Sequence, residues 1–428
     1  MQDFDELTED YSRGAVPDSA TSSAFEISLV LIGGLITLPI FLVGGQLGSS
    51  LGLKNASIAF VIAGFVLAIL GAGSGVLAAK TRLTTWLVIQ YSFGRSGAKI
   101  VCLFVAFTIL GWYGATVELF ARAVQQLVAD SAGNSATRIV YLISASVLMV
   151  STALFGFKGL DRLSKFAVPL MLLLLFGLAY KAVTGFDGPA DLIFTMSLAK
   201  GVSASIGGFI VGVTMFPDIC RYARSPKAAV VASGLSFGIG VPLVMLLAAI
   251  PVIMVDEQDF MKVLILLGVG LPGVVLLLLA TWTTNVFNLY SVSLSFAAVI
   301  ESVKKWKLVI IAGILGTGVA FLPILDNFLH FLNFLAVMIP PITGIYLADF
   351  FIIHKQNYNN RLLASTPAVR PKAFVAWILG SGVGYFSNLS VIEFTTVPAL
   401  DAIIAGFVSY ISLSFIARRY CQITFKPM

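Results

Sequence analysis

Charged side chains are scarce in this chain. Only 11% of its 428 residues are charged, 58% are hydrophobic, and the mean hydropathy is +0.97. A soluble globular domain carries about 25% charged residues, so this composition excludes that class and indicates many membrane-spanning segments. The net charge of +6 does not point to a nucleic-acid partner, because in membrane proteins such an excess is typical of basic cytoplasmic loops.

Cysteine and histidine are rare as well. Cys102, Cys220 and Cys421 have no paired spacing, and the two histidines, His330 and His354, form no ligand set. We therefore expect neither a disulfide framework nor a metal cluster. The chain lacks a phosphate-binding sequence of the G-x-x-x-x-G-K-S/T type, and its apolar runs hold few carboxylates, which disfavours an ATP-driven or proton pump. We expect no enzyme and no tightly held cofactor.

Long apolar runs, in contrast, are abundant. Runs of about 20 residues, enough to cross roughly 30 Å of hydrocarbon, can be placed twelve times. They cover approximately residues 25–48, 57–79, 98–129, 138–157, 164–184, 195–217, 227–254, 263–299, 307–323, 327–352, 372–390 and 398–417. The N-terminal MQDFDELTEDYSRG is acidic and polar, unlike a cleavable signal peptide, so we expect it to stay attached. With this tail inside, 21 of the 27 lysines and arginines lie on the cytoplasmic side, as the positive-inside rule predicts.

The sequence thus predicts an all-α polytopic protein in a lipid bilayer, with both termini cytoplasmic. Its first and sixth spans carry helix-breaking residues, namely Gly33, Gly34 and Pro39 in the first and Gly207, Gly208, Gly212 and Pro217 in the sixth. An offset of five helices reverses the topology of a second copy, which indicates two inverted five-helix repeats with broken helices 1 and 6. Gly and Pro are also common in membrane helices without such repeats, so that interpretation stays open.

These repeats divide the chain into segments. We expect a cytoplasmic tail at 1–24, a first repeat at 25–190, a second at 191–353, helices 11 and 12 within 354–417, and a cytoplasmic tail at 418–428. Broken helices leave carbonyls and helix-dipole ends without partners inside the protein, where a cation or polar solute can bind. A secondary transporter is therefore favoured over a channel.

The eighth span is unusually polar for an apolar run. It contains Thr281, Thr283, Thr284, Asn285, Asn288, Ser291, Ser293 and Ser295. Each unsatisfied polar group in hydrocarbon costs several kcal/mol, so these side chains need helices, water, an ion or a substrate as partners. Packing between helices is one interpretation, and the two asparagines favour a binding site because a carboxamide has up to four hydrogen bonds to satisfy.

Several strings of the chain resemble one known family. They are LTTWLVIQYSFG (83–94), GWYG (111–114), GGFIVGVTMFPDICRYARS (207–225), WTTN (282–285) and IPPITGIYLADF (339–350). Together they are similar to the bacterial nucleobase-cation symporters, nearest to the cytosine permease branch. The resemblance implies a leucine-transporter-like fold of twelve helices in the bacterial cytoplasmic (inner) membrane. It also implies a substrate between helices 1, 3, 6 and 8, and a sodium ion between helices 1 and 8.

The resemblance further implies particular site residues. Trp112 and Phe209 correspond to the aromatic pair that sandwiches the planar substrate. The remaining substrate-binding candidates are Asn285, Asn288, Gly208, Gly212, Ile109 and Thr116. For sodium, the matching positions are the main-chain carbonyls of Thr37 and Ile40 at the break of helix 1, with the Ala280 carbonyl and the Thr283 and Thr284 hydroxyls on helix 8. The i, i+3, i+4 spacing of the last three allows their oxygens to share one face, and neutral hard oxygens suit a monovalent cation.

The chain departs from the cytosine permease pattern at two positions. Ile109 replaces a glutamine, and Val286 replaces an acidic residue. Loss of two polar groups makes a purine or a hydroxymethylpyrimidine as suitable as cytosine. The alternatives are a proton-coupled symporter for a hydantoin-like or related substrate, and a non-transporting sensor or channel. A monomer is compatible with all of these, and the sequence does not set the oligomeric state.

Two further groups of residues are candidates for gating. Asp218 and Arg221 follow helix 6 at its predicted cytoplasmic end, where a charged pair could latch an inner gate. An interfacial anchor is the alternative for this pair. Pro340 and Pro341 are expected to distort helix 10 and to act either as a hinge or as a rigid kink.

Overall fold

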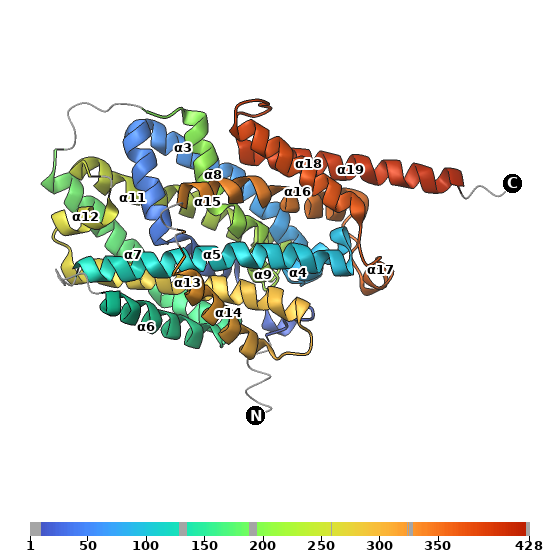
Figure 1. The fold of residues 1–428 in the computed structure, drawn as a ribbon, viewed down its shortest axis with the longest axis horizontal. Coiled ribbons are helices and arrows are strands. Elements are labelled where there is room, and N and C mark those ends of the chain that lie inside the picture. The colour runs from blue at the N-terminus through green and yellow to red at the C-terminus, as the bar shows by residue number, and fades with distance from the viewer. Residues whose placement is uncertain are drawn as a thin grey trace.

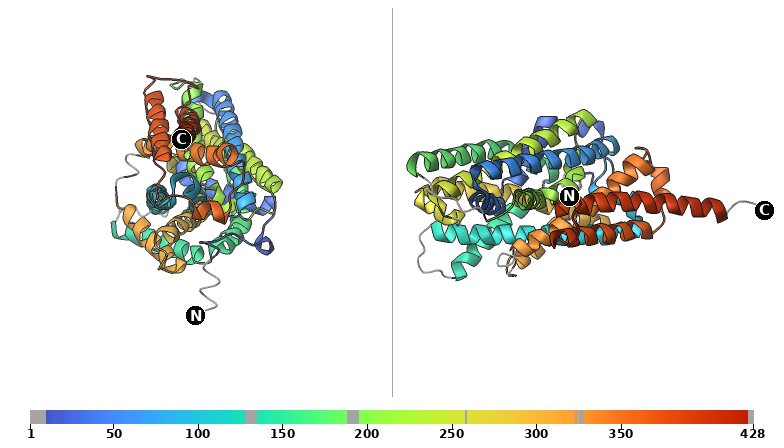
Figure 2. Two further views of the ribbon diagram at one scale, coloured as in Figure 1. Left: turned by 90° about the vertical axis from the view of Figure 1, so that its right-hand side faces the viewer. Right: turned by 90° about the horizontal axis from the view of Figure 1, so that it is seen from above.

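The computed structural model describes residues 10–127, 135–187, 195–257, 259–322, 324 and 328–424. Within these residues the regular structure is helical, and one isolated β-bridge joins Ser22 to Ala223. The long helices run broadly along one common axis of the molecule (Figure 2). Eight of the described helices are long and apolar enough to cross a membrane, and two shorter ones, Ala24–Leu35 and Leu198–Thr214, are also apolar. The expected all-α polytopic architecture is confirmed.

The helices follow one another along the chain in three groups. The first group is α2 (Ala24–Leu35), α3 (Leu38–Thr81), α4 (Thr85–Phe93), α5 (Arg95–Leu127), α6 (Ser135–Ala153) and α7 (Gly156–Gly185). The second is α8 (Leu198–Thr214), α9 (Phe216–Cys220), α10 (Pro226–Ser233), η2 (Gly234–Gly240), α11 (Val241–Val255), α12 (Phe260–Leu266), α13 (Gly270–Val299), α14 (Lys305–Val319), α15 (Phe328–Met338), α16 (Pro340–Ala348) and η3 (Asp349–Ile353). The third is α17 (Asn360–Ala364), α18 (Pro371–Asn388) and α19 (Pro398–Thr424).

The break expected in the first span is present between α2 and α3. Ile36 and Thr37 are extended, with φ/ψ of −77°/94° and −141°/148°, and Pro39 lies at the start of α3. A proline is tolerated there because the first helical N–H groups have no partner within the helix. The helix α3 is kinked at Gly52, whose φ of 70° is one that glycine adopts without strain. The part of α3 before this kink corresponds to the second half of the first predicted span, and the part after it corresponds to the second span.

The break in the sixth span does not lie at the glycines, where the sequence predicts it. The helix α8 continues through Gly207, Gly208 and Gly212 and ends at Thr214; the interruption is at Met215 (φ −91°, ψ 4°). Pro217 explains this position, because it has no N–H to donate to the preceding turn. The prediction of a break at the glycines is wrong.

The glycines of α8 serve close packing instead. A Cβ placed on Gly207 would lie 3.1 Å from the Ala336 side chain, and one on Gly208 would lie 3.1 Å from Cδ1 of Ile40. These separations are shorter than ordinary carbon–carbon contacts. The absent side chains therefore allow α15 and α3 to approach α8 at the height of the first break.

The helix α13 contacts helices from both the first and the second group. It packs against α5, α7, α14, α6 and α2, and its course beside α5 is visible in Figure 1. At one edge, α18 and α19 pack against each other and α19 contacts α16. Pro340 and Pro341 begin α16 after an interruption at Ile339, as expected for a distorted tenth helix.

Candidate functional site

A cavity of about 60 Å³ lies where the two helix breaks meet. On the same measure a water molecule occupies about 10 to 15 Å³, so the space is small but well above that of one water. Its walls come from α2, α3, α5, α8, α13, η2 and α15, and they include the break residues Thr37 and Met215. Of the predicted substrate-binding residues, six line it: Trp112, Phe209, Gly208, Gly212, Ile109 and Asn288.

The aromatic walls of the cavity come from two different helices. Trp112 projects from α5, and Phe209 projects from α8, where it is 3% exposed. The Trp112 ring is further held by Phe331, with ring centroids 6.4 Å apart and planes inclined by 38°. Two flat, polarizable walls suit a planar ligand, and such contacts add about 0.5–1.5 kcal/mol beyond area burial.

The polar groups of the cavity are few. Asn288 and Thr284 on α13, Thr108 on α5 and Thr37 at the first break lie among its lining residues. The Thr108 hydroxyl donates to the carbonyl of Val105 at 2.7 Å. The Thr37 hydroxyl is buried without a hydrogen-bond partner, and such a group costs about 1–3 kcal/mol unless a ligand or water satisfies it. The sequence predicts that the main-chain carbonyl of Thr37 binds a ligand; the structure shows that its hydroxyl is available as well.

Two predicted substrate-binding residues do not line the cavity. The Asn285 Oδ1 accepts hydrogen bonds from the Thr116 hydroxyl (2.8 Å) and the Asn288 Nδ2 (3.1 Å). Its Nδ2 points to the Tyr113 carbonyl, at 3.5 Å. In this structure Asn285 and Thr116 therefore pair with each other, and their contact with the substrate stays a prediction.

Helical geometry explains where Asn285 points. Thr284 and Asn288 are four residues apart and share a face, whereas Asn285 is rotated by about 100° from Thr284. Asn285 thus orients the Asn288 carboxamide from behind, through the 3.1 Å hydrogen bond.

The residues expected to bind sodium are only partly brought together. The Thr284 hydroxyl lies 3.3 Å from the carbonyl oxygens of both Gly34 and Ile36, so it joins α13 to the end of α2. The Thr283 hydroxyl lies 2.9 Å from the Leu279 carbonyl and 3.3 Å from the Ala280 carbonyl, both on its own helix.

On the first helix the carbonyls differ from those expected. The Thr37 carbonyl accepts the N–H groups of Ile40 and Phe41, at 3.0 and 3.2 Å, because it begins α3. The last carbonyls of a helix have no partner within it, and here Gly34 and Ile36 supply them beside Thr284. Because the last carbonyls of a helix lack partners, these two residues could have been identified from the sequence, but only if the end of the first helix had been placed to within one or two residues.

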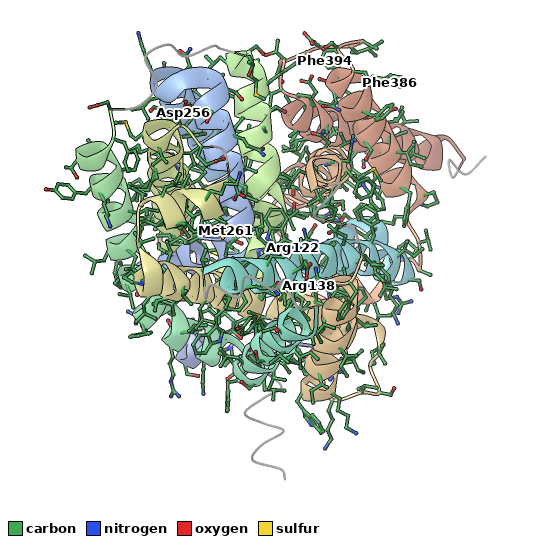
Figure 3. The ribbon with its side chains drawn as sticks, turned by 60° about the vertical axis from the view of Figure 1, so that its left-hand side comes forward. Arg122, Arg138, Asp256, Met261, Phe386 and Phe394 are labelled. Atoms are coloured by element: carbon green, nitrogen blue, oxygen red, sulfur yellow. The ribbon has the colours of Figure 1, made fainter. Side chains whose placement is uncertain are left out.

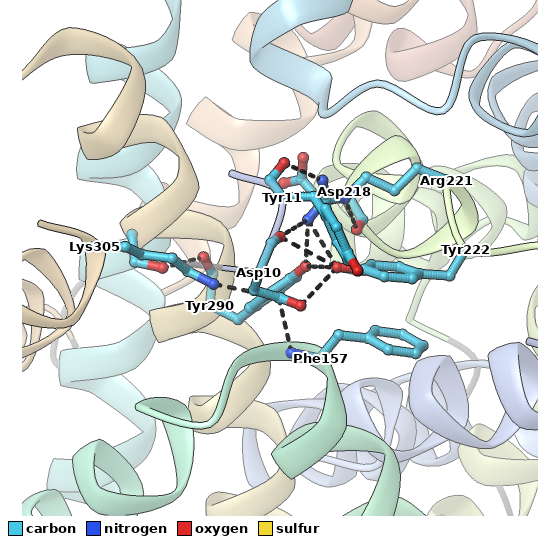
Figure 4. A network of polar contacts seen from close by, with 9 residues as sticks. Asp10, Tyr11, Phe157, Asp218, Arg221, Tyr222, Tyr290 and Lys305 are labelled. Carbon is cyan, nitrogen blue, oxygen red and sulfur yellow. Dashed lines mark hydrogen bonds and ion pairs between the residues drawn. The ribbon is translucent and has the colours of Figure 1, made fainter. Parts of the chain in front are cut away.

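The expected ion pair between Asp218 and Arg221 is not formed. Arg221 Nε donates to the Asp218 main-chain carbonyl, at 3.1 Å, and the guanidinium turns toward the N-terminal segment (Figure 4). There Nη1 donates to the Tyr11 carbonyl (2.7 Å), and Nη2 donates to the Asp10 carbonyl (2.9 Å) and the Tyr290 hydroxyl (2.8 Å). Arg221 pairs with a segment more than 200 residues away, not with its neighbour on α9.

The Asp10 side chain completes this cluster. Its carboxylate accepts hydrogen bonds from the Tyr222 hydroxyl (2.8 Å) and the Phe157 N–H (3.0 Å), and it pairs with Lys305 (3.3 Å). Burial alone would raise the pKa of the Asp10 carboxyl, but the charges of Lys305 and Arg221 outweigh it and hold that pKa below its usual value. We call Asp10, Tyr11, Arg221, Tyr222, Tyr290 and Lys305 the N-terminal clamp; it joins the N-terminal segment to α9, α13 and α14.

A second cavity opens at the other end of the broken sixth helix. It measures about 540 Å³ and lies between α3, α8, α15 and the segment that joins α18 to α19. Lys200 and Gly207 of α8 line it, together with Glu393 and Asn333. The N-terminal clamp follows α9, so the large cavity and the clamp lie at opposite ends of the α8–α9 unit, with the smaller cavity between them.

Glu118 lies apart from both cavities. It accepts hydrogen bonds from Arg122 (2.8 Å) and from Arg138 of α6 (2.7 Å), and Figure 3 shows these two arginines near each other. These two arginines therefore account for its burial without a substrate or an ion. Glu118 lies six residues after Trp112, about 240° around the helix, so it points away from the Trp112 face.

Comparisons with known proteins agree with this architecture. The family model for permeases of cytosine/purines, uracil, thiamine and allantoin matches residues 15–412. The cytosine permease of Escherichia coli strain K12 is 31% identical over 419 residues, which cover 96% of this chain and 95% of the relative. The hydantoin permease of Microbacterium maritypicum is 23% identical over 382 residues, covering 81% of this chain and 76% of the relative.

A solved structure shows the same fold. It is that of Mhp1, a nucleobase-cation-symport-1 family transporter, in a closed conformation with bromovinylhydantoin bound. The TM-score is 0.82 at 19% identity, with 97% of this chain and 96% of the other covered. The relatives are permeases rather than enzymes. The chain is a membrane transporter and belongs to the family of permeases for cytosine/purines, uracil, thiamine and allantoin.

Proposed function

We propose that the protein imports a planar nucleobase-like heterocycle together with sodium, by alternating access. The observation that carries this proposal is the cavity at the two helix breaks, which has Trp112 and Phe209 as walls and Asn288 as a polar contact. A carboxamide offers both a donor and an acceptor, as the edge of a heterocycle requires. The apolar side chain of Ile109 in the same wall favours a ring that is less polar at that edge than cytosine.

The sodium ion is proposed to bind between α2 and α13. The carbonyls of Gly34 and Ile36 and the Thr284 hydroxyl already meet there at 3.3 Å, and the Ala280 carbonyl and Thr283 hydroxyl lie on the same helix. An ion at this point would fix the first break, which forms part of the substrate cavity. Ion and substrate would then raise each other's affinity, a reciprocal coupling of about 1–3 kcal/mol.

The arrangement of the spans follows from the same proposal. We infer twelve membrane-spanning helices in two inverted repeats, 25–190 and 191–353, followed by two helices within 354–417. The tails 1–24 and 418–428 are cytoplasmic, and the membrane is the bacterial cytoplasmic membrane. With this orientation the N-terminal clamp closes the cytoplasmic end, while the 540 Å³ cavity faces outside and admits the substrate. Pro340 and Pro341 would let α15 move over that cavity.

Thermal stabilisation of the purified protein tests the proposal. We would compare nucleobases, hydroxymethylpyrimidine and hydantoins in sodium and in potassium at matched ionic strength. A ligand at 100 times its dissociation constant adds about 2.7 kcal/mol to the free energy of unfolding. We expect one class of heterocycle to stabilise the protein in sodium only. Stabilisation that is equal in both salts contradicts sodium coupling, and no response to any compound contradicts the substrate class.

A further inference from the structure

Asp218 is a buried carboxylate that the proposed transport site does not use. It lies on α9 and is 1% exposed. Its Oδ1 accepts the Thr85 N–H at 2.8 Å, whereas its Oδ2 has no hydrogen-bond partner. Among the described residues no cationic atom lies within 4 Å of this carboxylate; Arg221 acts on it only through its charge, because its Nε donates to the Asp218 main-chain carbonyl. A buried charge in this condition is costly unless something pairs with it.

Two buried hydroxyls lie beside the Asp218 carboxylate. The side chains of Thr85 on α4 and Ser291 on α13 both act on the Asp218 carboxylate. Both hydroxyls are buried and lie within hydrogen-bonding reach of that carboxylate, but neither Thr85 Oγ1 nor Ser291 Oγ makes a hydrogen bond of good geometry to it or to another described group. Three buried oxygens that lack a well-formed hydrogen bond therefore lie close together, and they come from three separate helices.

Other hydroxyls of α13 show that this is not a general property of the helix. The Ser293 hydroxyl donates to the Tyr290 carbonyl at 2.7 Å, and the Ser295 hydroxyl donates to the Ser291 carbonyl at 3.1 Å. A serine in a membrane helix commonly satisfies itself in this way. Ser291 does not bond its own helix; its hydroxyl lies within reach of the Asp218 side chain, where it can bind a ligand together with the carboxylate.

We infer that Asp218 Oδ2, Thr85 Oγ1 and Ser291 Oγ bind a small monovalent cation, sodium under transport conditions. Carboxylate and hydroxyl oxygens are the ligands that hard cations prefer, and a single carboxylate balances a single positive charge. This site is separate from the one at Thr284, which lies seven residues earlier on α13.

The position of the site gives the ion a role in the transport cycle. The helix α9 follows the break at Met215, whose side chain lines the substrate cavity, and Arg221 of the N-terminal clamp lies three residues after Asp218. An ion at Asp218 would tie α9 to α4 and α13 while the clamp is closed. Movement of α9 away from α13 would separate the three oxygens and release the ion. The binding site stands on the geometry above, and its part in coupling rests on the proposed function.

Equilibrium binding of ²²Na⁺ to the purified full-length protein, without substrate, tests the inference. We expect two sodium ions per wild-type protein and one in Ser291→Ala. The matched control is Ser293→Ala, which removes a hydroxyl that is already satisfied on the same helix, and it should retain both ions. Asp218→Asn should resemble Ser291→Ala; if it does not fold, Ser291→Ala and Thr85→Ala still decide the question.

The variant Thr284→Ala separates this site from the proposed transport site. It should lose one ion, and the combination with Ser291→Ala should lose both. Wild-type sodium binding in Ser291→Ala and Thr85→Ala would overturn the inference, because a water or a proton would then occupy the position. Loss in Ser291→Ala but not in Thr284→Ala would support the Asp218 site and contradict sodium binding between α2 and α13.

Discussion

Replacement of Asp10 by asparagine should open the end of the molecule that the N-terminal clamp closes. The Asp10 and Lys305 side chains are only 9% and 1% exposed, and their charged atoms lie 3.3 Å apart. Removal of one partner from a buried pair costs about 3–5 kcal/mol because the other charge stays buried. We take the lower value, about 3 kcal/mol, because asparagine retains one oxygen that can accept a hydrogen bond. At about 1.4 kcal/mol per factor of ten, the open population should rise roughly a hundredfold.

Cys102 can report this opening. It is buried on α5, and Asp218 acts on it electrostatically, so it lies toward α9 in the closed state. In a protein that retains Cys102 as its single cysteine, through Cys220→Ala and Cys421→Ser, the labelling rate by a small thiol reagent measures the open fraction. We expect Asp10→Asn to raise this rate about a hundredfold. The reasoning is refuted if the rate changes less than about threefold.

The matched control is the exposed pair of Lys99 and Glu301. Its atoms lie 3.4 Å apart, but the side chains are 38% and 73% exposed. Such pairs contribute about 0–1 kcal/mol, so Glu301→Gln should leave the labelling rate of Cys102 nearly unchanged. An effect as large as that of Asp10→Asn would show that general charge loss, not the clamp, controls the opening.

Three more predictions concern the site and the clamp. Trp112→Ala should abolish stabilisation by the heterocycle while the protein elutes normally in size-exclusion chromatography; wild-type affinity would rule out stacking. Asn288→Ala should weaken substrate binding more than Asn285→Ala weakens it, as measured by calorimetry, because only Asn288 lines the cavity; the reverse order would return Asn285 to the substrate contacts. Because the pKa of Asp10 is lowered from 3.8, the clamp is stabilised above that value and loses strength only as pH falls below it. The labelling rate of Cys102, corrected for the thiolate fraction of a free thiol, should therefore stay constant from pH 7 to about 5. A rise in this rate within that range would contradict the expected pH dependence of the clamp.

The sequence predicted the parts of the structure that depend on local patterns. Pro39 marked the first helix break, and Trp112 and Phe209 were found through short strings shared with the family. Pro217 marked the second break more accurately than Gly207 and Gly208. Those glycines could be interpreted only after the structure showed which neighbours they admit, since breaking a helix and packing closely favour the same residue.

Long-range contacts escaped prediction for a different reason. Arg221 and Asp218 are neighbours on α9, which suggested that they pair, but Asp10 and Tyr11 approach Arg221 from across more than 200 residues. No pattern among neighbouring residues indicates a contact between segments that lie so far apart in the chain. The direction in which Asn285 points also depends on the rotation of α13 about its axis. The sequence leaves the boundaries of that span uncertain by roughly two to four residues, so it does not determine this rotation.

Uptake into proteoliposomes tests the central claim most directly. The heterocycle found by thermal stabilisation would be supplied outside, with an inward sodium gradient that is either maintained or collapsed by a sodium ionophore. Sodium-coupled import predicts accumulation above the external concentration with the gradient, and equilibration alone without it. Accumulation that ignores the sodium gradient and follows an imposed proton gradient would contradict the account.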